Sequence, residues 1–423
     1  MNSVGNNLRA ALALALLAGL GAAPAAAKVK ARIIENLCET ASCTRDFSNV
    51  GLTMSPSGDI YGVNDQDGAN HEGSVFRLHQ RAGHNKWTYQ TIHGFCAQAN
   101  CTDGSFPRGG LIADTAGNLY GTTQTGGPTG HGEVFRLSPG GAFDVLYGFC
   151  PANDSCPDGA GPGAALTYPN AAAGAFYDGV SPLTGVAYTG GSHNSGTAYQ
   201  LTPGSGGWSF AVLINYNSAC APDAIVMTTG TNVYETQRLG CESVGNGAGA
   251  IMLLQQATPS WKETVLYAFC AQINCTDGED PRGQVVIDGS GALYGADDEG
   301  GNAGGTAFKL TPDGLAWDFQ LLHTFCSLPG CHDGVWPMGG LIADANGNLF
   351  GTTNGYGNRS RSGTIFEIGE GGGFQTLHEF CSGTCKEGSR PIAGVLMDGA
   401  GNLFGKTTEG GGQGSGTVFA LTP

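Results

Sequence analysis

Three histidines stand in the glycine-rich segments of three consecutive repeats of this chain: His71, His131 and His193. An imidazole can act as a general base near neutral pH or ligate a metal, so these residues are the catalytic candidates. They stand five, four and six residues before the aromatic residue of the next predicted strand, so their spacing does not bring them to one point. The alternative interpretation is three solvated loop histidines.

Two arginines, Arg108 and Arg282, occupy the same place in the second and fifth repeats, just before a predicted strand. A guanidinium binds a carboxylate through forked hydrogen bonds. In a ring of seven repeats these two lie nearly opposite each other, so the pair is predicted to hold an acidic sugar such as a uronic acid. Alternatively, each arginine pairs with a neighbouring acid, for instance Asp103 or Asp280.

Trp336 differs from the other four tryptophans, which open predicted strands and are expected to pack within the repeats: Trp87, Trp208, Trp261 and Trp317. Trp336 lies instead in a loop, where other repeats carry Phe106, Asp280 and Arg390. An aromatic ring on a loop face can stack on a sugar. The alternative is a lid over the edge of a sheet.

Motifs with a fixed chemistry are absent from the sequence, which has no nucleophile elbow, phosphate-binding loop or His-Glu-x-x-His motif. Residues Asn64–Glu72 are similar to a calcium loop but lack the full alternating ligand set and the closing acid. The sequence therefore predicts no cofactor and no metal site.

The 14 cysteines fall into seven local pairs. Six pairs follow an aromatic-led strand phrase, and the seventh links two loops of the fourth repeat: Cys38/Cys43, Cys96/Cys101, Cys150/Cys156, Cys270/Cys275, Cys326/Cys331, Cys381/Cys385 and Cys220/Cys241. An even count in an exported chain predicts disulfides. Zinc is the alternative, but a tetrahedral site needs two pairs close together, and pairs on separate repeats would sit apart.

One phrase recurs along the whole chain, as at Gly109–Thr123 and Gly339–Thr353. Each copy is followed by a glycine-rich stretch, a strand phrase such as Glu133–Leu137 and an aromatic-led phrase such as Trp261–Tyr267. A Tyr-Gly dyad or its equivalent marks each copy, at steps of 59, 64, 50, 60, 56 and 54 residues: Gly62, Gly121, Gly185, Glu235, Gly295, Gly351 and Gly405. Seven copies of four short strands predict an all-β, seven-bladed β-propeller with four-stranded blades. The third and fourth copies are degenerate, so six or eight blades are the alternatives.

The two ends of the chain complete one blade. Lys30–Leu37 resembles the fourth strand of a repeat, and the chain stops at Pro423, just after a third strand. The N-terminal strand is therefore predicted to join the last blade and close the ring, which removes an exposed edge. Residues 28–423 then form a single propeller domain, with ligand sites expected on the loops of one face.

The N-terminus has the order of a secretory signal peptide, with Arg9, an apolar run from Ala10 to Leu20 and a small-residue cleavage site at Ala25–Ala27. Residues 1–27 are therefore predicted to be removed on export to the periplasm or beyond, with an uncleaved anchor as the alternative. The formal net charge of −16 argues against nucleic acid as a partner. No later apolar run is long enough to span a membrane. We expect a monomer.

Residues 117–123 (GNLYGTT), residues 347–353 (GNLFGTT) and the G-x-V-F-x-L-x-P phrase that follows resemble the GloVer tandem-repeat family of exported bacterial proteins. The resemblance runs from about Ile33 to Pro423. It implies a propeller-like fold and an extracytoplasmic setting, and it implies no activity. The chain departs from the family in its Phe-Cys-x4-Cys loops and in lacking a C-terminal anchor.

Two functions fit these residues. The favoured one is a non-catalytic propeller that binds a glycan or cell-envelope polymer through Arg108, Arg282 and Trp336. The alternative is a polysaccharide-active enzyme on the same face, either a lyase that neutralises a uronate with the arginines or a hydrolase with two carboxylates.

Overall fold

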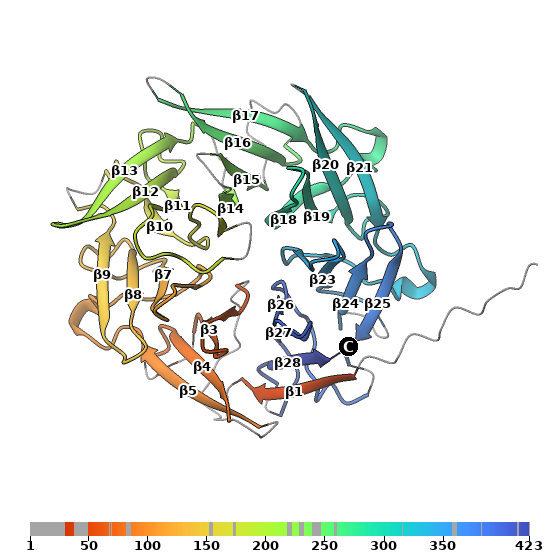
Figure 1. Ribbon diagram of the computed structural model, residues 1–423, viewed down its shortest axis with the longest axis horizontal. Coiled ribbons are helices and arrows are strands. Elements are labelled where there is room, and N and C mark those ends of the chain that lie inside the picture. Colours follow the sequence, from red (N-terminus) through yellow and green to blue (C-terminus); the bar gives the residue numbers. More distant parts are fainter. Residues whose placement is uncertain are drawn as a thin grey trace, which may run out of the picture.

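The computed structural model describes most of the chain beyond the leader (Figure 1). The described residues are 30–37, 50–66, 68, 70–81, 86–151, 155–171, 175–217, 222–227, 232–238, 247–257, 260–314, 316–357, 362–381, 383–412 and 414–422. The predicted signal peptide, residues 1–27, lies outside them. No described residue belongs to a helix that is long and apolar enough to cross a membrane.

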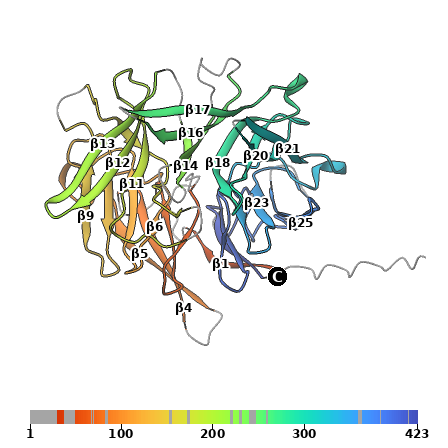
Figure 2. The same ribbon diagram turned by 45° about the horizontal axis from the view of Figure 1, so that its top comes forward.

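Seven four-stranded antiparallel sheets stand around a ring (Figures 1 and 2). In six blades the strands follow chain order from the axis outward, and in the seventh the outermost strand is β1, the first strand of the chain. Blade one holds β2 (Thr53–Met54), β3 (Ile60–Asn64), β4 (Ser74–Gln80) and β5 (Trp87–Gly94). Blade two holds β6 (Ile112–Ala113), β7 (Leu119–Thr123), β8 (Glu133–Leu137) and β9 (Phe143–Gly148). Blade three holds β10 (Ala160–Pro162), β11 (Leu183–Thr189), β12 (Thr197–Gly204) and β13 (Gly207–Asn215).

Blade four holds β14 (Pro222–Met227), β15 (Val233–Gln237), β16 (Ala250–Gln256) and β17 (Trp261–Ala268). Blade five holds β18 (Glu279–Ile287), β19 (Leu293–Glu299), β20 (Thr306–Asp313) and β21 (Ala316–Thr324). Blade six holds β22 (Ile342–Ala343), β23 (Leu349–Thr353), β24 (Thr364–Ile368) and β25 (Phe374–Glu379). Blade seven holds β26 (Leu396–Met397), β27 (Leu403–Thr407), β28 (Thr417–Thr422) and β1 (Lys30–Asn36). The predicted seven-bladed, four-stranded propeller is confirmed.

The ring closes where the first strand joins the last blade. β1 pairs antiparallel with β28, from Lys30 opposite Thr422 to Asn36 opposite Thr417. Figure 1 shows β1 along the outer side of β28, beside β5 of blade one. This confirms the predicted closure, in which both ends of the chain share one sheet.

Tight turns join the first and second strands of most blades, and an aspartate organises them. In blade two, Asp114 Oδ1 accepts hydrogen bonds from the backbone N–H groups of Ala116 and Asn118, at 2.9 and 2.8 Å. Gly117 takes a φ of 84°, which a side chain would disfavour. The Asp-x-x-Gly-Asn motif is therefore a self-bonded turn, as its sequence predicts.

The glycine that marks each repeat lies beneath an aromatic ring of the third strand. In blade five, a Cβ added to Gly295 would stand 2.4 Å from Cζ of Phe308. Phe308 is fully buried and contacts Phe269 at the end of the preceding blade, with ring centroids 5.0 Å apart. The repeated glycine therefore makes room for the ring that fills each blade.

Blade four departs from this pattern. Glu235 takes the place of the glycine and Met252 stands opposite it, where other blades carry Phe or Tyr. The Glu235 carboxylate is fully buried and accepts hydrogen bonds from the Tyr216 hydroxyl at 2.5 Å and from Gln237 Nε2 at 3.4 Å. Gln237 Nε2 also donates to Glu263 at 3.3 Å. A buried polar network thus replaces an apolar ring contact, and burial raises the pKa of Glu235 to about 8.

The stability of blade four should depend on pH. The folded-state pKa of Glu235 exceeds its unfolded value, so the folded chain holds a proton that the unfolded chain has lost between about pH 4.5 and pH 8. The stability from this proton is complete below that window and is lost as the pH rises through it. Glu235→Gln lacks this dependence, so we expect it to gain on the order of 3 kcal/mol relative to the wild type between pH 5 and pH 8.

The measurement is urea unfolding of both proteins at the two pH values. Glu370→Gln makes the same chemical change at an exposed position and should follow the wild type. A constant difference between Glu235→Gln and the wild type would show that Glu235 is already ionised in the folded protein.

Candidate functional site

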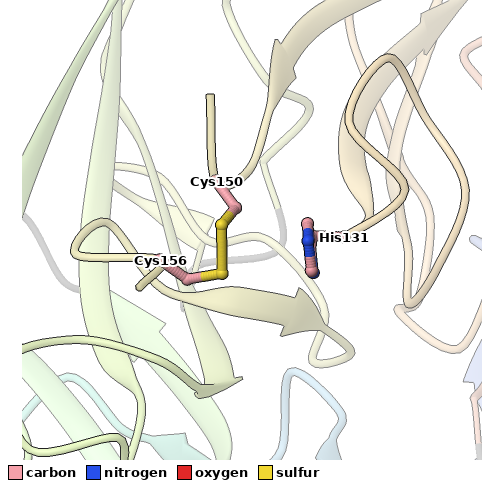
Figure 3. A group of neighbouring side chains, drawn as sticks. All are labelled: His131, Cys150 and Cys156. Atoms are coloured by element: carbon pink, nitrogen blue, oxygen red, sulfur yellow. A yellow bond between two sulfur atoms is a disulfide. The ribbon is translucent and has the colours of Figure 1, made fainter. Parts of the chain in front are cut away.

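Two sets of loops meet on one face of the ring: those that enter each blade and those between its second and third strands. The loop that enters blade three carries Cys150 and Cys156. The loop between the second and third strands of blade two carries His131. Figure 3 shows His131 beside the disulfide of these two cysteines. We call this side of the ring the loop face.

Five of the predicted disulfides lie among the described residues and are confirmed: Cys96–Cys101, Cys150–Cys156, Cys270–Cys275, Cys326–Cys331 and Cys381–Cys385. Cys38, Cys43, Cys220 and Cys241 lie outside the described residues. Three of the loops contain a single 3-10 turn: η1 (Ala99–Cys101), η4 (Ile273–Cys275) and η5 (Pro329–Cys331). Each bridge closes a very short loop, so it holds the local shape more than it limits the unfolded chain.

In four of the described disulfide loops an aspartate after the second cysteine organises the loop: Asp103, Asp158, Asp277 and Asp333. Asp333 is fully buried, and its carboxylate accepts hydrogen bonds from the backbone N–H groups of Ser327 and Leu328, at 2.9 and 3.2 Å. Asp277 does the same for Ala271 and Gln272. The repeated acid is therefore structural, as expected for a residue that recurs in most blades.

In five blades a histidine or tyrosine near the end of the fourth strand approaches the acid of the following disulfide loop: His93, Tyr147, Tyr267, His323 and His378. Tyr267 donates to Asp277 at 2.8 Å, and His323 Nε2 lies 3.0 Å from Asp333. His323 is also stacked on Phe374 of the next blade, with centroids 3.7 Å apart. Burial lowers the pKa of His323 and of His93, although a neighbouring acid opposes the shift. The sequence did not single out these histidines, and their packing makes them part of the blade junctions.

The residue that crosses from one blade to the next takes a left-handed conformation. Phe106, Asp280, Trp336 and Arg390 have φ between 54° and 59° and each precedes a proline. The Trp336 N–H donates to the Gly304 carbonyl of the preceding blade at 2.8 Å. Its own carbonyl accepts from the N–H of Asn354 at 2.9 Å. A Cβ on Gly305 would meet Cδ of Pro337 at 2.8 Å, so the proline packs directly on the neighbouring backbone.

Arg108 and Arg282 are each held by acids. Arg108 Nε lies 3.5 Å from Asp65, and its side chain is 45% exposed. Arg282 lies within β18, with Nη2 3.2 Å from Asp280 and 2.8 Å from Asp298, and its side chain is 12% exposed. The predicted ion pair with Asp280 is therefore present at Arg282. Arg108 pairs with Asp65 and not with Asp103, whose carboxylate accepts from the backbone of its own disulfide loop.

Blade five gathers further charge around Arg282. Arg238 from blade four donates two hydrogen bonds to Asp280, both at 3.1 Å. Burial raises the pKa of Asp298 to about 7, and the Arg282 guanidinium opposes that shift. Asp297 beside it is fully buried, and burial raises its pKa well above the usual range. Arg238 could not be found by sequence reasoning, because its contact joins residues 42 positions apart.

Trp336 forms an aromatic pair with Tyr356 of the same blade. Their centroids are 6.2 Å apart with an interplanar angle of 61°, and Tyr356 is 39% exposed. Gly355 leaves room for the Trp336 ring, since a Cβ there would stand 2.8 Å from Cε3. Beside the pair, Arg390 donates to Asn354 at 3.3 Å and to Glu409 at 3.3 Å. Sequence reasoning missed Tyr356, which belongs to a different loop from Trp336.

The structure brings only part of the predicted site together. Gly283, next to Arg282, lies against Gly340 of the Trp336 loop, because a Cβ there would stand 2.4 Å from the Gly340 nitrogen. Arg282 and Trp336 therefore belong to adjacent blade junctions, five and six. Arg108 belongs to blade two, on the opposite side of the ring (Figure 1).

The three candidate histidines remain in separate blades. His71 and His193 are exposed, and His193 Nδ1 lies 3.0 Å from the Ser192 hydroxyl. Among the described residues, no hydrogen bond or ion pair joins any of His71, His131 and His193 to Arg108 or Arg282.

Two groups have the residue types of a metal site: His131 with Cys150 and Cys156, and Glu279 with Cys270 and Cys275. In each group the ligand atoms lie within 4.8 Å of one another. All four sulfur atoms are in disulfides (Figure 3 shows the first), so they are not the thiolates that zinc binds.

Comparison with known proteins gives one family and several distant structures. The family described as the Gloeobacter/Verrucomicrobia repeat matches residues 44–182 and 177–419. No curated protein sequence matches the chain. A Bacteroides uniformis protein named as a 6-phosphogluconolactonase has a TM-score of 0.48 at 11% identity, over 80% of this chain and 86% of that one.

Two further structures are more distant. A gluconolactonase from Xanthomonas campestris has a TM-score of 0.40 at 13% identity, over 74% of this chain and 85% of that one. A puromycin-hydrolysing peptidase from Mycobacterium tuberculosis has a TM-score of 0.40 at 11% identity, over 88% of this chain and 62% of that one. These likenesses are too distant to transfer an activity, a ligand or a site.

The disulfide loops should lose stability when their acid is removed. Asp333→Ala removes the buried carboxylate that accepts from two backbone N–H groups and from the Ser327 hydroxyl, so we expect the free energy of unfolding to fall by about 1–3 kcal/mol. Asp313→Ala, at an exposed turn of blade five, is the control and should change it by less than about 0.5 kcal/mol. Denaturant unfolding under oxidising conditions measures both. Equal losses in the two variants would contradict the role assigned to Asp333.

Proposed function

This chain belongs to the Gloeobacter/Verrucomicrobia repeat family, and from that premise we propose that it is an extracytoplasmic propeller that binds a glycan or cell-envelope polymer on its loop face. The observation that carries the proposal is the aromatic pair of half-buried Trp336 and exposed Tyr356, in the blade next to the Arg282 cluster. The five described disulfides fit an oxidising compartment outside the cytoplasm. Export through cleavage after residue 27 and a monomeric state belong to the same proposal.

The aromatic pair suits a sugar because a pyranose ring presents C–H groups on one face and hydroxyls around its edge. Trp and Tyr side chains offer an apolar body for that face, together with polar atoms at the rim. The left-handed backbone at Trp336, held by two hydrogen bonds and followed by a proline, fixes the ring in advance. Little conformational entropy is then lost when a ligand stacks on it.

The arginines around the aromatic pair are already paired with acids, so this surface is suited to hydrogen bonding rather than to binding by net positive charge. Arg238 and Arg390 side chains are each 34% exposed and already oriented by acids, Asp280 and Glu409. A guanidinium in such a place can donate to sugar hydroxyls or to a uronate carboxylate. Nucleic acid stays an unlikely partner, because the chain carries a net charge of −16.

A second candidate, a polysaccharide hydrolase on the same face, is favoured by one observation. Asp280 and Asp298 both contact the same Nη2 atom of Arg282, and the pKa of Asp298 is raised to about 7. Two close carboxylates, one of them with a raised pKa, are typical of the active site of a glycosidase. The side chain of Asp298 is only 7% exposed, which disfavours access by a sugar and keeps binding as the preferred function.

Loss of the aromatic ring should weaken binding at this site. Trp336→Ala removes the stacking surface, so we expect its affinity for the polysaccharide to fall by about tenfold. Retardation in gels that contain an acidic or a neutral polysaccharide measures this affinity. Phe106→Ala changes the same left-handed position in blade two and is the matched control, expected to keep the wild-type affinity.

The same panel should be monitored for unsaturated products and new reducing ends. Retardation without product formation supports a binding protein. Saturated products with new reducing ends that disappear in Asp298→Asn would establish the hydrolase, whereas unsaturated products would indicate a lyase. If Trp336→Ala and Phe106→Ala bind every polymer equally well, the aromatic pair is not the binding site.

A further inference from the structure

A cavity of about 650 Å³ lies between blades seven and one, at the seam where the ring closes. Its walls come from the paired terminal strands, from the first turns of both blades and from β4 and β5: Arg32, Met54, Gly58, Gln80, Trp87, Asp398, Asn402, Phe404 and Thr422. These residues lie on the turns and strand ends opposite the loop face. The size is that of sites for small organic ligands, which run from about 300 to 1,000 Å³.

The cavity has a cause in the sequence of blade seven. Phe404, Ala420 and Arg32 stand directly across from one another on β27, β28 and β1. In blade two the corresponding row is Tyr120, Arg136 and Asp144, with a long side chain on the third strand. Ala420 leaves that space unfilled, between a phenyl ring and a guanidinium.

Arg32 forms no ion pair with any of the described residues. No side-chain hydrogen bond joins it to any of them either, and its Nε is buried without a partner. The indole Nε1 of Trp87, on the other side of the seam, is likewise buried without an acceptor. Two lining residues therefore carry N–H donors that have no acceptor within the described chain, which is costly unless something supplies one.

The remaining lining sets the shape and charge of the ligand. The ring of Trp87 packs edge-on to Phe404, with centroids 5.8 Å apart, and gives one side of the cavity an apolar surface. Asp398 is occupied by its own turn, accepting from Ala400 and Asn402, and it adds a negative charge to the lining. That charge disfavours a phosphate or a second carboxylate.

We propose that this seam cavity binds a ring-bearing monocarboxylic acid, whose carboxylate pairs with Arg32 and accepts from Trp87 while its ring packs against the aromatic side. The ligand contacts both β1 and blade one, so binding stabilises the closed ring. An aromatic acid and a cyclic sugar acid share this chemistry, and both are tested below. The site is separate from the loop face.

Calorimetric titration of the full protein with phenylacetate and with glucuronate tests the proposal, using phenylacetamide and glucose as their uncharged counterparts. We expect saturable binding of at least one acid, a rise in the melting temperature with its concentration, and at least about tenfold weaker binding of the uncharged counterpart. Binding of phenylacetate would identify the ligand as an aromatic acid, and binding of glucuronate would identify it as a sugar acid.

Two variants test whether the acid binds in the seam cavity, and a third is their control. Arg32→Gln should lower the affinity for the acid by at least about tenfold. Arg81→Gln, which removes an exposed arginine that lines no part of the cavity, should leave the affinity within about twofold. Thr422→Trp places a large ring at an exposed position of the cavity wall, and it should abolish binding while the protein without ligand stays as stable as the wild type.

Binding of neither acid, equal binding of acid and uncharged counterpart, or equal loss in Arg32→Gln and Arg81→Gln would overturn the proposal. Unchanged binding in Thr422→Trp would do the same. Trp336→Ala should leave binding at the seam unaffected, so failure here and failure of the loop-face site are distinguishable.

Discussion

The close approach of backbones at the blade junctions is the constraint on which this structure depends. At each described junction the entering loop brings a residue in the left-handed conformation, then a proline, against a glycine of the preceding blade. A Cβ on that glycine would stand 2.3 Å from Cδ of Pro107 at the first junction and 2.6 Å from Cδ of Pro391 at the last described one. Because nothing larger than hydrogen fits, the blades meet at a fixed distance and the loops leave the ring at a fixed angle.

This constraint gives the loop face its chemistry. Backbone hydrogen bonds and the following proline set the backbone conformation at this position, so the side chain can differ from blade to blade while the backbone stays the same. Phe106, Asp280, Trp336 and Arg390 thus occupy one position with four different side chains. Asp280 recruits Arg238 and Arg282, whereas Trp336 pairs with Tyr356. The repeat supplies the frame, and departures from the repeat supply the candidate site.

Much of the frame could be predicted from the sequence because it is periodic. Seven copies of four strands, the closing strand Lys30–Asn36 and the local disulfides all follow from spacing and from pairing rules. The glycines beneath Phe308 and its equivalents repeat for the same reason. These features need only neighbours in the chain or the next repeat.

The site could be predicted only in part because its contacts cross between repeats. Arg282 was found as a departure from the pattern, but its second partner, Asp298, comes from the next strand. Tyr356 and Arg238 carry no local signal, and the seam cavity depends on Ala420, which is small where other blades are large. The buried Glu235 network was visible only as a missing glycine.

Native-state hydrogen exchange at the junction residues tests the central claim most directly. The N–H groups of Phe106, Asp280, Trp336 and Arg390 each donate to the preceding blade, at 2.8 Å in every case. If these contacts hold the ring together, their amides should exchange only through global unfolding, with the same free energy that denaturant unfolding gives. Exchange at the rate of an exposed loop would contradict the account, because the loop face would then not be fixed by the junctions.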